Sequence, residues 1–103
     1  MSQLINICAA AELTPGQRRL VDVRDDDEAL VLNIDGAYYA ISNVCPHAGA
    51  ALERGDVMDG VLFCPLHQWG FRLADGRSIA GDHLCARTYR VITRGGHLYL
   101  ACD

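Results

Sequence analysis

The chain has 103 residues and a net charge of −4 at pH 7; half of its residues are hydrophobic and 21% are charged. This composition indicates one globular domain with a modest core, and an acidic chain without a Lys/Arg-rich stretch is a poor candidate for binding nucleic acid or anionic lipid. The N-terminal stretch MSQLINICAAAEL does not have the pattern of a signal peptide, and no segment approaches a membrane span, so we expect a cytoplasmic protein without a membrane partner.

The first half of the chain predicts short strands joined by tight turns. Strands are expected at residues 3–9, 18–23, 28–34 and 37–42, with at most one helical turn at 9–13. Thr14-Pro15-Gly16 marks one turn, and Asp35-Gly36 is the strongest two-residue hairpin signal available. The acidic run at residues 25–28 is expected to form a solvated turn between two strands.

The second half predicts more short strands. The apolar run at 61–63 and the stretch GFRL at 70–73 indicate two small strands, and residues 87–93 and 97–103 flank a glycine-containing turn as a last hairpin. We therefore predict an all-β fold in a single domain, 1–103. Its base is a small antiparallel β-sandwich or barrel, and a subdomain made of two loops is inserted at about residues 43–72.

Two of the predicted loops carry the same pair of side chains. Cys45-Pro46-His47 and Cys64-Pro65-Leu66-His67 each present one thiol and one imidazole. The odd total of five cysteines and the expected cytoplasmic location argue against a disulfide scaffold. The remaining cysteines and histidines have no such pairing: we expect the cysteines to be small buried hydrophobic residues and the histidines to be ordinary surface or strand residues (Cys8, Cys85, Cys102, His83 and His97).

The order of the four side chains indicates which kind of metal site they form. Zinc fingers usually pair two Cys on one loop and two His on a helix, although a Cys₂His₂ zinc site remains an alternative. Here Cys and His alternate, which suits two metal ions that each need a different ligand pair, such as the irons of a [2Fe–2S] cluster. Each loop would then hold both irons.

Cys45-x-His47 and Cys64-x-x-His67 resemble the ligand motif of Rieske [2Fe–2S] proteins, and the strand pattern extends the resemblance over most of the chain. The resemblance implies one [2Fe–2S] cluster per chain, with Cys45 and Cys64 on the inner iron and His47 and His67 on the outer iron. Gly49 matches a family glycine that allows backbone amides to approach the sulfurs, although a simple turn glycine explains it equally well. A proline is missing from residues 78–85, where many relatives cover the cluster with a proline-containing loop.

The same resemblance implies an electron-transfer protein or a non-catalytic subunit whose partners are redox proteins. Trp69, Gln68 and the stretch DHLCARTYRV favour, slightly, the small subunit of an NAD(P)H nitrite reductase that feeds a sirohaem subunit. The alternative is a ferredoxin that passes electrons from a flavin reductase to an aromatic-ring dioxygenase. High-potential relatives carry a disulfide, a Ser and a Tyr at positions matching Ala50, Leu66, Trp69 and Phe71. Their absence predicts a midpoint potential at the lower end of the Rieske range, which runs from roughly −150 to +300 mV.

Overall fold

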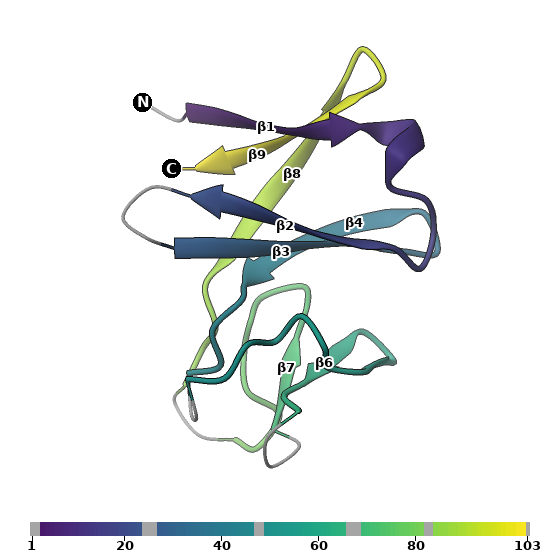
Figure 1. Cartoon of the computed structure of the whole chain (residues 1–103). Helices are drawn as coiled ribbons and strands as arrows, with labels where there is room; N and C mark the ends of the chain where they lie inside the picture. Colours follow the sequence, from purple (N-terminus) through teal and green to yellow (C-terminus); the bar gives the residue numbers. More distant parts are fainter. Residues whose placement is uncertain (1–2, 24–26, 47–48, 66–68, 82–83, 103) are drawn as a thin grey trace.

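The computed structural model describes residues 3–23, 27–46, 49–65, 69–81 and 84–102. Nine strands and a single 3₁₀ turn make up its regular structure within these ranges (Figure 1). The strands are β1 (Gln3–Ala9), β2 (Arg18–Val23), β3 (Asp27–Ile34), β4 (Ala37–Ser42), β5 (Val57–Met58), β6 (Val61–Phe63), β7 (Gly70–Arg72), β8 (Thr88–Arg94) and β9 (His97–Cys102), and the 3₁₀ turn is Ala10–Glu12. Among the described residues no helix has the length and apolar character needed to cross a bilayer.

Six strands form an antiparallel sheet in the order β1-β9-β8-β4-β3-β2. Side chains from both edge strands, Cys8 of β1 and Val21 of β2, pack in one core with Val31 and Leu98, which requires the sheet to curl toward a barrel. We call this the barrel core; its buried members are Cys8, Leu13, Val21, Val23, Ala29, Val31, Ala40, Leu98 and Leu100. The predicted all-β, antiparallel fold is confirmed.

A second, three-stranded sheet in the order β5-β6-β7 lies beside the barrel, below it in Figure 1. It packs against the outer face of β3 and β4 through what we call the junction core, whose buried members are Leu30, Leu32, Ile41, Cys45, Leu52, Leu62, Cys64, Phe71, Leu73 and Ala86. Strand β3 serves both cores, because Leu30 and Leu32 point into the junction core while Ala29 and Val31 point into the barrel core. A strand buried on both faces needs an uninterrupted apolar run, and Ala-Leu-Val-Leu supplies it.

The predicted turns form as the local sequence dictates. Asp35 and Gly36 both have positive φ, 54° and 94°, which is the type I′ geometry of a two-residue hairpin between β3 and β4. Asp59-Gly60 makes the same turn between β5 and β6, with φ values of 52° and 76°. The strands predicted from the sequence are all present, with boundaries that differ by a residue or two.

Two expectations about individual residues are wrong. Asp27 and Glu28 do not lie in a solvated turn: both belong to β3, and their carboxylates accept hydrogen bonds from Ser42 (3.0 Å) and Asn43 (3.0 Å). Cys85 is exposed rather than buried, because it forms an isolated bridge with Arg77 at the surface instead of joining a strand. Asp25, Asp26, His83 and the side chain of Cys102 lie outside the described residues.

The expectations for Cys8 and His97 are confirmed. Cys8 is buried in the barrel core with 6% of its surface exposed. His97 is partly buried in β9, where its ring lies in hydrogen-bond contact with the side chain of Asn6. Both residues belong to the barrel, so they provide controls for substitutions at the candidate site.

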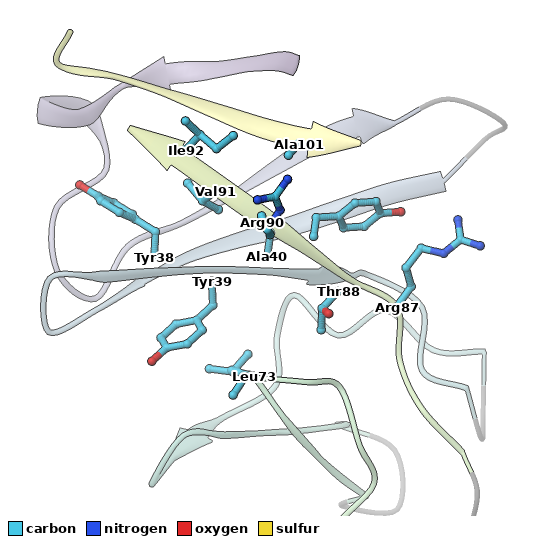
Figure 2. Close-up of a pocket in the computed structure, with 12 residues that line it drawn as sticks. Tyr38, Tyr39, Ala40, Leu73, Arg87, Thr88, Arg90, Val91, Ile92 and Ala101 are labelled. Carbon is cyan, nitrogen blue, oxygen red and sulfur yellow. The ribbon is translucent and has the colours of Figure 1, made fainter. Parts of the chain in front are cut away.

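A groove of about 850 Å³ opens where β4 and β8 diverge (Figure 2). The two strands pair only at Ala40↔Tyr89 and Ile41↔Thr88, and beyond these pairs β8 turns toward β9. The groove is lined by Tyr38, Tyr39, Ala40, Leu73, Ala74, Arg87, Thr88, Tyr89, Arg90, Val91, Ile92 and Ala101. Neither Cys45 nor Cys64 lines it, so the groove is separate from the cysteine loops.

Tyr89 fastens β8 to β3 across β4. Its hydroxyl donates a hydrogen bond to the Asp27 carboxylate, which also accepts one from Ser42. The pKa of Tyr89 is raised to about 12, mainly because the hydroxyl is buried and, second, because it donates this hydrogen bond to Asp27. Because the folded-state pKa lies above the ordinary value of about 10, this contribution to stability is fully present below pH 10. It is lost as the pH rises from 10 through 12.

We expect Tyr89→Phe to lower the free energy of unfolding at pH 7 by about 1 kcal/mol, the typical net value of one hydrogen bond. The variant should also lose less stability between pH 10 and pH 12 than the wild type does. The basic side chains are nine arginines with no lysine, so lysine titration does not obscure this window. Urea unfolding at pH 7, 9 and 11 measures both effects, and Tyr39→Phe controls for loss of a hydroxyl from the same groove. If the wild type and Tyr89→Phe lost the same amount of stability at alkaline pH, the stabilising role given to the Tyr89 hydroxyl would be contradicted.

Candidate metal centre

The first cysteine loop is a short hairpin that continues from the end of β4. Its arms are joined by the hydrogen bonds from Leu52 N–H to the Asn43 carbonyl (2.8 Å) and from Cys45 N–H to the Ala50 carbonyl (2.9 Å). Val44 and Ala51 form a bridge between these two bonds. The backbone of Cys45 is therefore fixed at the last paired position before the tip of the hairpin.

Gly49 closes the tip of this hairpin. Its N–H donates to the Cys45 carbonyl (2.8 Å), and its φ of +68° lies in the left-handed region that favours glycine. An added Cβ would meet no atom within 4 Å, so the backbone conformation, rather than lack of space, calls for glycine here. Gly49 thus stands in a turn and its own N–H is engaged by the Cys45 carbonyl.

The second cysteine loop connects β6 to β7. Cys64 directly follows β6, and its N–H donates to the Trp69 carbonyl (2.6 Å), so the loop closes on itself as the first one does. Gly70 begins β7, and an added Cβ there would lie 2.8 Å from side-chain atoms of Val61 and Ile79. Glycine at this position lets the chain return close beside β6, which holds the loop above the junction core.

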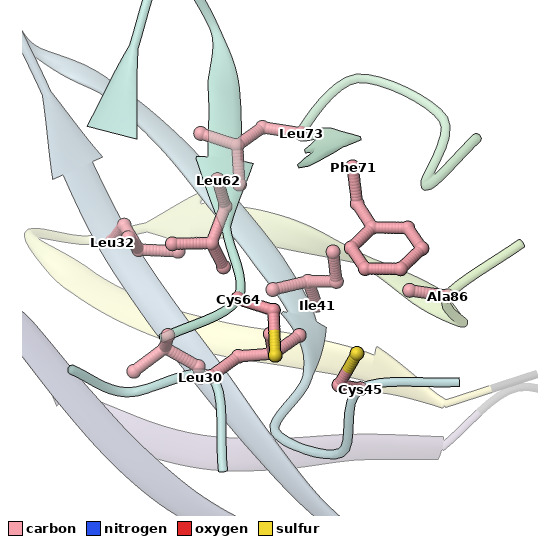
Figure 3. Packing of buried hydrophobic residues seen from close by; sticks show 10 residues of the cluster. Leu30, Leu32, Ile41, Cys45, Leu62, Cys64, Phe71, Leu73 and Ala86 are labelled. Carbon is pink, nitrogen blue, oxygen red and sulfur yellow. The ribbon is translucent and has the colours of Figure 1, made fainter. Parts of the chain in front are cut away.

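The fold brings the two cysteines together in the junction core (Figure 3). Cys45 and Cys64 have 1% and 0% of their surface exposed, and both belong to this core although they are 19 positions apart in the sequence. Trp69 and Ala50 are partly buried and pack against the same core. His47 and His67 lie outside the described residues.

The donor set fits a [2Fe–2S] cluster. Two ionised thiols in an apolar core would carry two buried negative charges, which are costly unless a cation compensates them. An oxidised two-iron, two-sulfide core has a charge of +2 and would neutralise them. Two of the four predicted ligands, Cys45 and Cys64, are among the described residues. The described residues include no group of three Cys, His, Asp or Glu side chains that could hold a metal ion.

A buried amide at the base of the first hairpin was missed from the sequence. Asn43 has 4% of its surface exposed and contacts Glu28 and Glu53 through its side chain. One polar residue after a strand is an ordinary pattern, so only its burial and contacts reveal a role.

Comparisons with known proteins agree on one family. A family model for the Rieske [2Fe-2S] domain matches residues 3–90. The ferredoxin component of the alkene monooxygenase system of Xanthobacter autotrophicus is 28% identical over 98% of this chain and 83% of its own length. The 3-phenylpropionate/cinnamic acid dioxygenase ferredoxin subunit of Photorhabdus laumondii is 33% identical over 97% of this chain and 94% of its own.

One solved structure is similar over the whole chain. It is a proposed NADH-dependent nitrite reductase small subunit from Mycobacterium tuberculosis, with a TM-score of 0.89 and 25% sequence identity. The match covers 100% of this chain and 97% of that one. The barrel with its added three-stranded sheet is thus an architecture that this chain shares with that solved structure.

Proposed function

The chain belongs to the Rieske [2Fe–2S] domain family, and on that premise we propose that it is the ferredoxin component of an oxygenase system, passing electrons from a reductase to the terminal oxygenase. Membership of the family implies one [2Fe–2S] cluster per chain. The observation that supports a cluster in this chain is the meeting of two buried thiols, Cys45 and Cys64, at the closed bases of two loops. The protein is a carrier and leaves the chemistry on substrate to its partner.

The ligand assignment is part of the proposal. Cys45 and Cys64 would hold the inner iron from the junction core, and His47 and His67 would hold the outer iron. When bound, the cluster supplies a one-electron couple. The chain would contribute two buried cysteine side chains, loops closed by backbone hydrogen bonds, and the proposed subdomain at about 43–72 that holds both loops. Imidazole ligands each keep one ring N–H, through which the potential becomes pH dependent.

The choice of partner rests on the names of the relatives. The sequence slightly favoured a nitrite reductase small subunit, but both curated relatives described above are ferredoxin components of oxygenase systems. The matches cover 83% and 94% of these two relatives' own lengths. The nitrite reductase small subunit remains the second candidate because the M. tuberculosis structure matches every residue of the chain.

We expect the anaerobically purified protein to contain two irons and two acid-labile sulfides per chain and to give a Rieske-type EPR signal when it is reduced. Iron and sulfide analysis with EPR at cryogenic temperature provides the measurement. A colourless protein with one zinc ion would instead establish the Cys₂His₂ zinc site and overturn the proposal.

The partner is tested by the rate at which the reduced protein is reoxidised. We expect rapid reoxidation by a ring-hydroxylating oxygenase and slow reoxidation by a sirohaem nitrite reductase, followed by stopped-flow absorbance. Buffer alone and the oxidised protein serve as controls. The opposite order of rates would select the nitrite reductase reading while leaving the cluster assignment intact.

A further inference from the structure

We propose that Asn43 is a positioning residue for the first cysteine loop: its buried amide ties the base of the hairpin to β3 and thereby sets where Cys45 stands. The inference rests on the proposed function, because it concerns how the chain presents a cluster ligand. Asn43 itself touches no iron in this proposal; it acts through the backbone two residues before Cys45.

The main chain of Asn43 joins the hairpin to the barrel. Its N–H donates to the Glu28 carbonyl of β3 (2.8 Å), and its carbonyl accepts from Leu52 N–H in the returning arm (2.8 Å). Asn43 is thus the last residue attached to β3 and the first paired residue of the hairpin. The main chain of Asn43 therefore couples the first arm of the hairpin to β3 and to the returning arm.

The side chain of Asn43 bonds both neighbouring segments. Its Nδ2 donates to the Glu28 carboxylate of β3 (3.0 Å) and to the Glu53 carboxylate just past the hairpin (3.4 Å). Arg18 Nη1 of β2 donates to the Glu53 carbonyl (2.9 Å), which fastens the same returning arm from the other side. The two arms of the hairpin are therefore held to two adjacent strands of the barrel.

Burial and chemistry explain why this position needs an amide. The two carboxylates repel each other, and a donor between them holds them in place, whereas an aspartate would add a third acceptor. The amide oxygen Oδ1 is buried and accepts no hydrogen bond from any described residue. The two bonds donated by Nδ2 are therefore what the side chain contributes to holding the hairpin.

Asn33 provides the matched control. It is a buried asparagine with 3% of its surface exposed, it lies at the other end of β3, and its Nδ2 donates to the Leu13 carbonyl (2.8 Å). Its Oδ1 accepts from Gly36 N–H in the β3–β4 turn (2.8 Å). Asn33→Asp therefore disturbs a buried amide of the barrel without touching the cysteine hairpin.

The experiment uses the whole chain as purified and compares three variants. Two are the single substitutions Asn43→Asp and Asn33→Asp, and the third carries Asn43→Asp and Glu28→Gln together. Iron release to a chelator is timed, and amide hydrogen exchange is followed at Cys45 and Leu52, with Val31 of the barrel as the internal reference. We expect Asn43→Asp to release iron about tenfold faster, the usual scale for residues that orient metal ligands. Exchange at the two hairpin amides should rise relative to Val31. Asn33→Asp should leave both the release rate and this ratio unchanged.

The double variant tests the contact itself. The glutamine introduced at position 28 can donate to the aspartate introduced at position 43, so the hydrogen bond is restored in the opposite direction and release should return close to the wild-type rate. If Asn43→Asp does not fold, Glu28→Ala and Glu28→Gln replace it: the alanine variant loses the acceptor and should release iron several-fold faster, while glutamine keeps an acceptor and should not.

Three results would overturn the inference. The first is an Asn43→Asp protein that releases iron and exchanges its hairpin amides at the wild-type rates, and the second is an equal effect of Asn33→Asp. Where the two Glu28 variants are used instead, the third is an equal rate of iron release from Glu28→Ala and Glu28→Gln. A wild-type protein without iron would overturn the proposed function instead, and the exchange ratios at Cys45 and Leu52 would still decide whether Asn43 holds the hairpin.

Discussion

Cys64→Ala is expected to yield a folded protein that binds no [2Fe–2S] cluster. Cys64 is fully buried in the junction core beside Cys45, and its thiolate is one of two that can offset the charge of the iron core there. Alanine would remove the proposed ligand, and with it the anaerobic colour and the EPR signal of the reduced protein. Iron and sulfide per chain should fall from two to none.

Cys8→Ala is the matched control for this substitution. Cys8 is also a buried cysteine, but it lies in the barrel core on β1. Its loss should lower the free energy of unfolding by about 1 kcal/mol, a common value for a single substitution, and leave the iron content at two per chain. A Cys64→Ala protein that retains two irons and two sulfides would refute the ligand assignment.

A lower midpoint potential is the expected result of His67→Cys. Two thiolates and two neutral imidazoles leave the oxidised site with no net charge, and a third thiolate makes it −1, so adding an electron becomes less favourable. Rieske centres lie between roughly −150 and +300 mV, and all-cysteine plant-type centres lie near −400 mV. One exchanged ligand should therefore lower the potential by more than about 100 mV.

The wild-type potential that serves as reference should itself lie near the lower end of the Rieske range. Phe71 is fully buried and Ala50 partly buried in the junction core, and neither side chain has a hydroxyl or thiol to offer the site. His97→Cys in β9 adds a cysteine away from the site and should not change the potential. Spectroelectrochemical titration of all three proteins measures these values. Equal midpoints for His67→Cys and the wild type would exclude His67 as a ligand.

Much of this fold follows from local sequence. Asp35-Gly36 and Asp59-Gly60 adopt positive φ because their residue types tolerate it, and these turns fix the pairing of the strands on either side. The two cysteine motifs indicate a Rieske protein without any tertiary information, because ligand chemistry is encoded in residue type and spacing. The strands come from this level, and the low-potential expectation is what the resemblance to Rieske proteins implies.

Other features depend on residues that are distant in the chain. Cys85 sits in an apolar stretch but faces solvent, since its bridge partner Arg77 is supplied by another loop. Asp27 looked like part of a solvated turn, yet it pairs with Tyr89, which lies 62 positions later. Local propensity cannot anticipate such contacts, because the partner becomes a neighbour only after the sheet has formed.

The ligand types, the turns and the strands could be read from the chain alone, since each depends on the chemistry of residues a few positions apart. Three features emerged only with the three-dimensional packing: β3 is buried on both faces, two thiols meet between two sheets, and an ordinary asparagine fastens the hairpin carrying one of them. The physical reason is that burial and charge depend on which segments pack together, and that is settled only when the barrel and the small sheet close on β3.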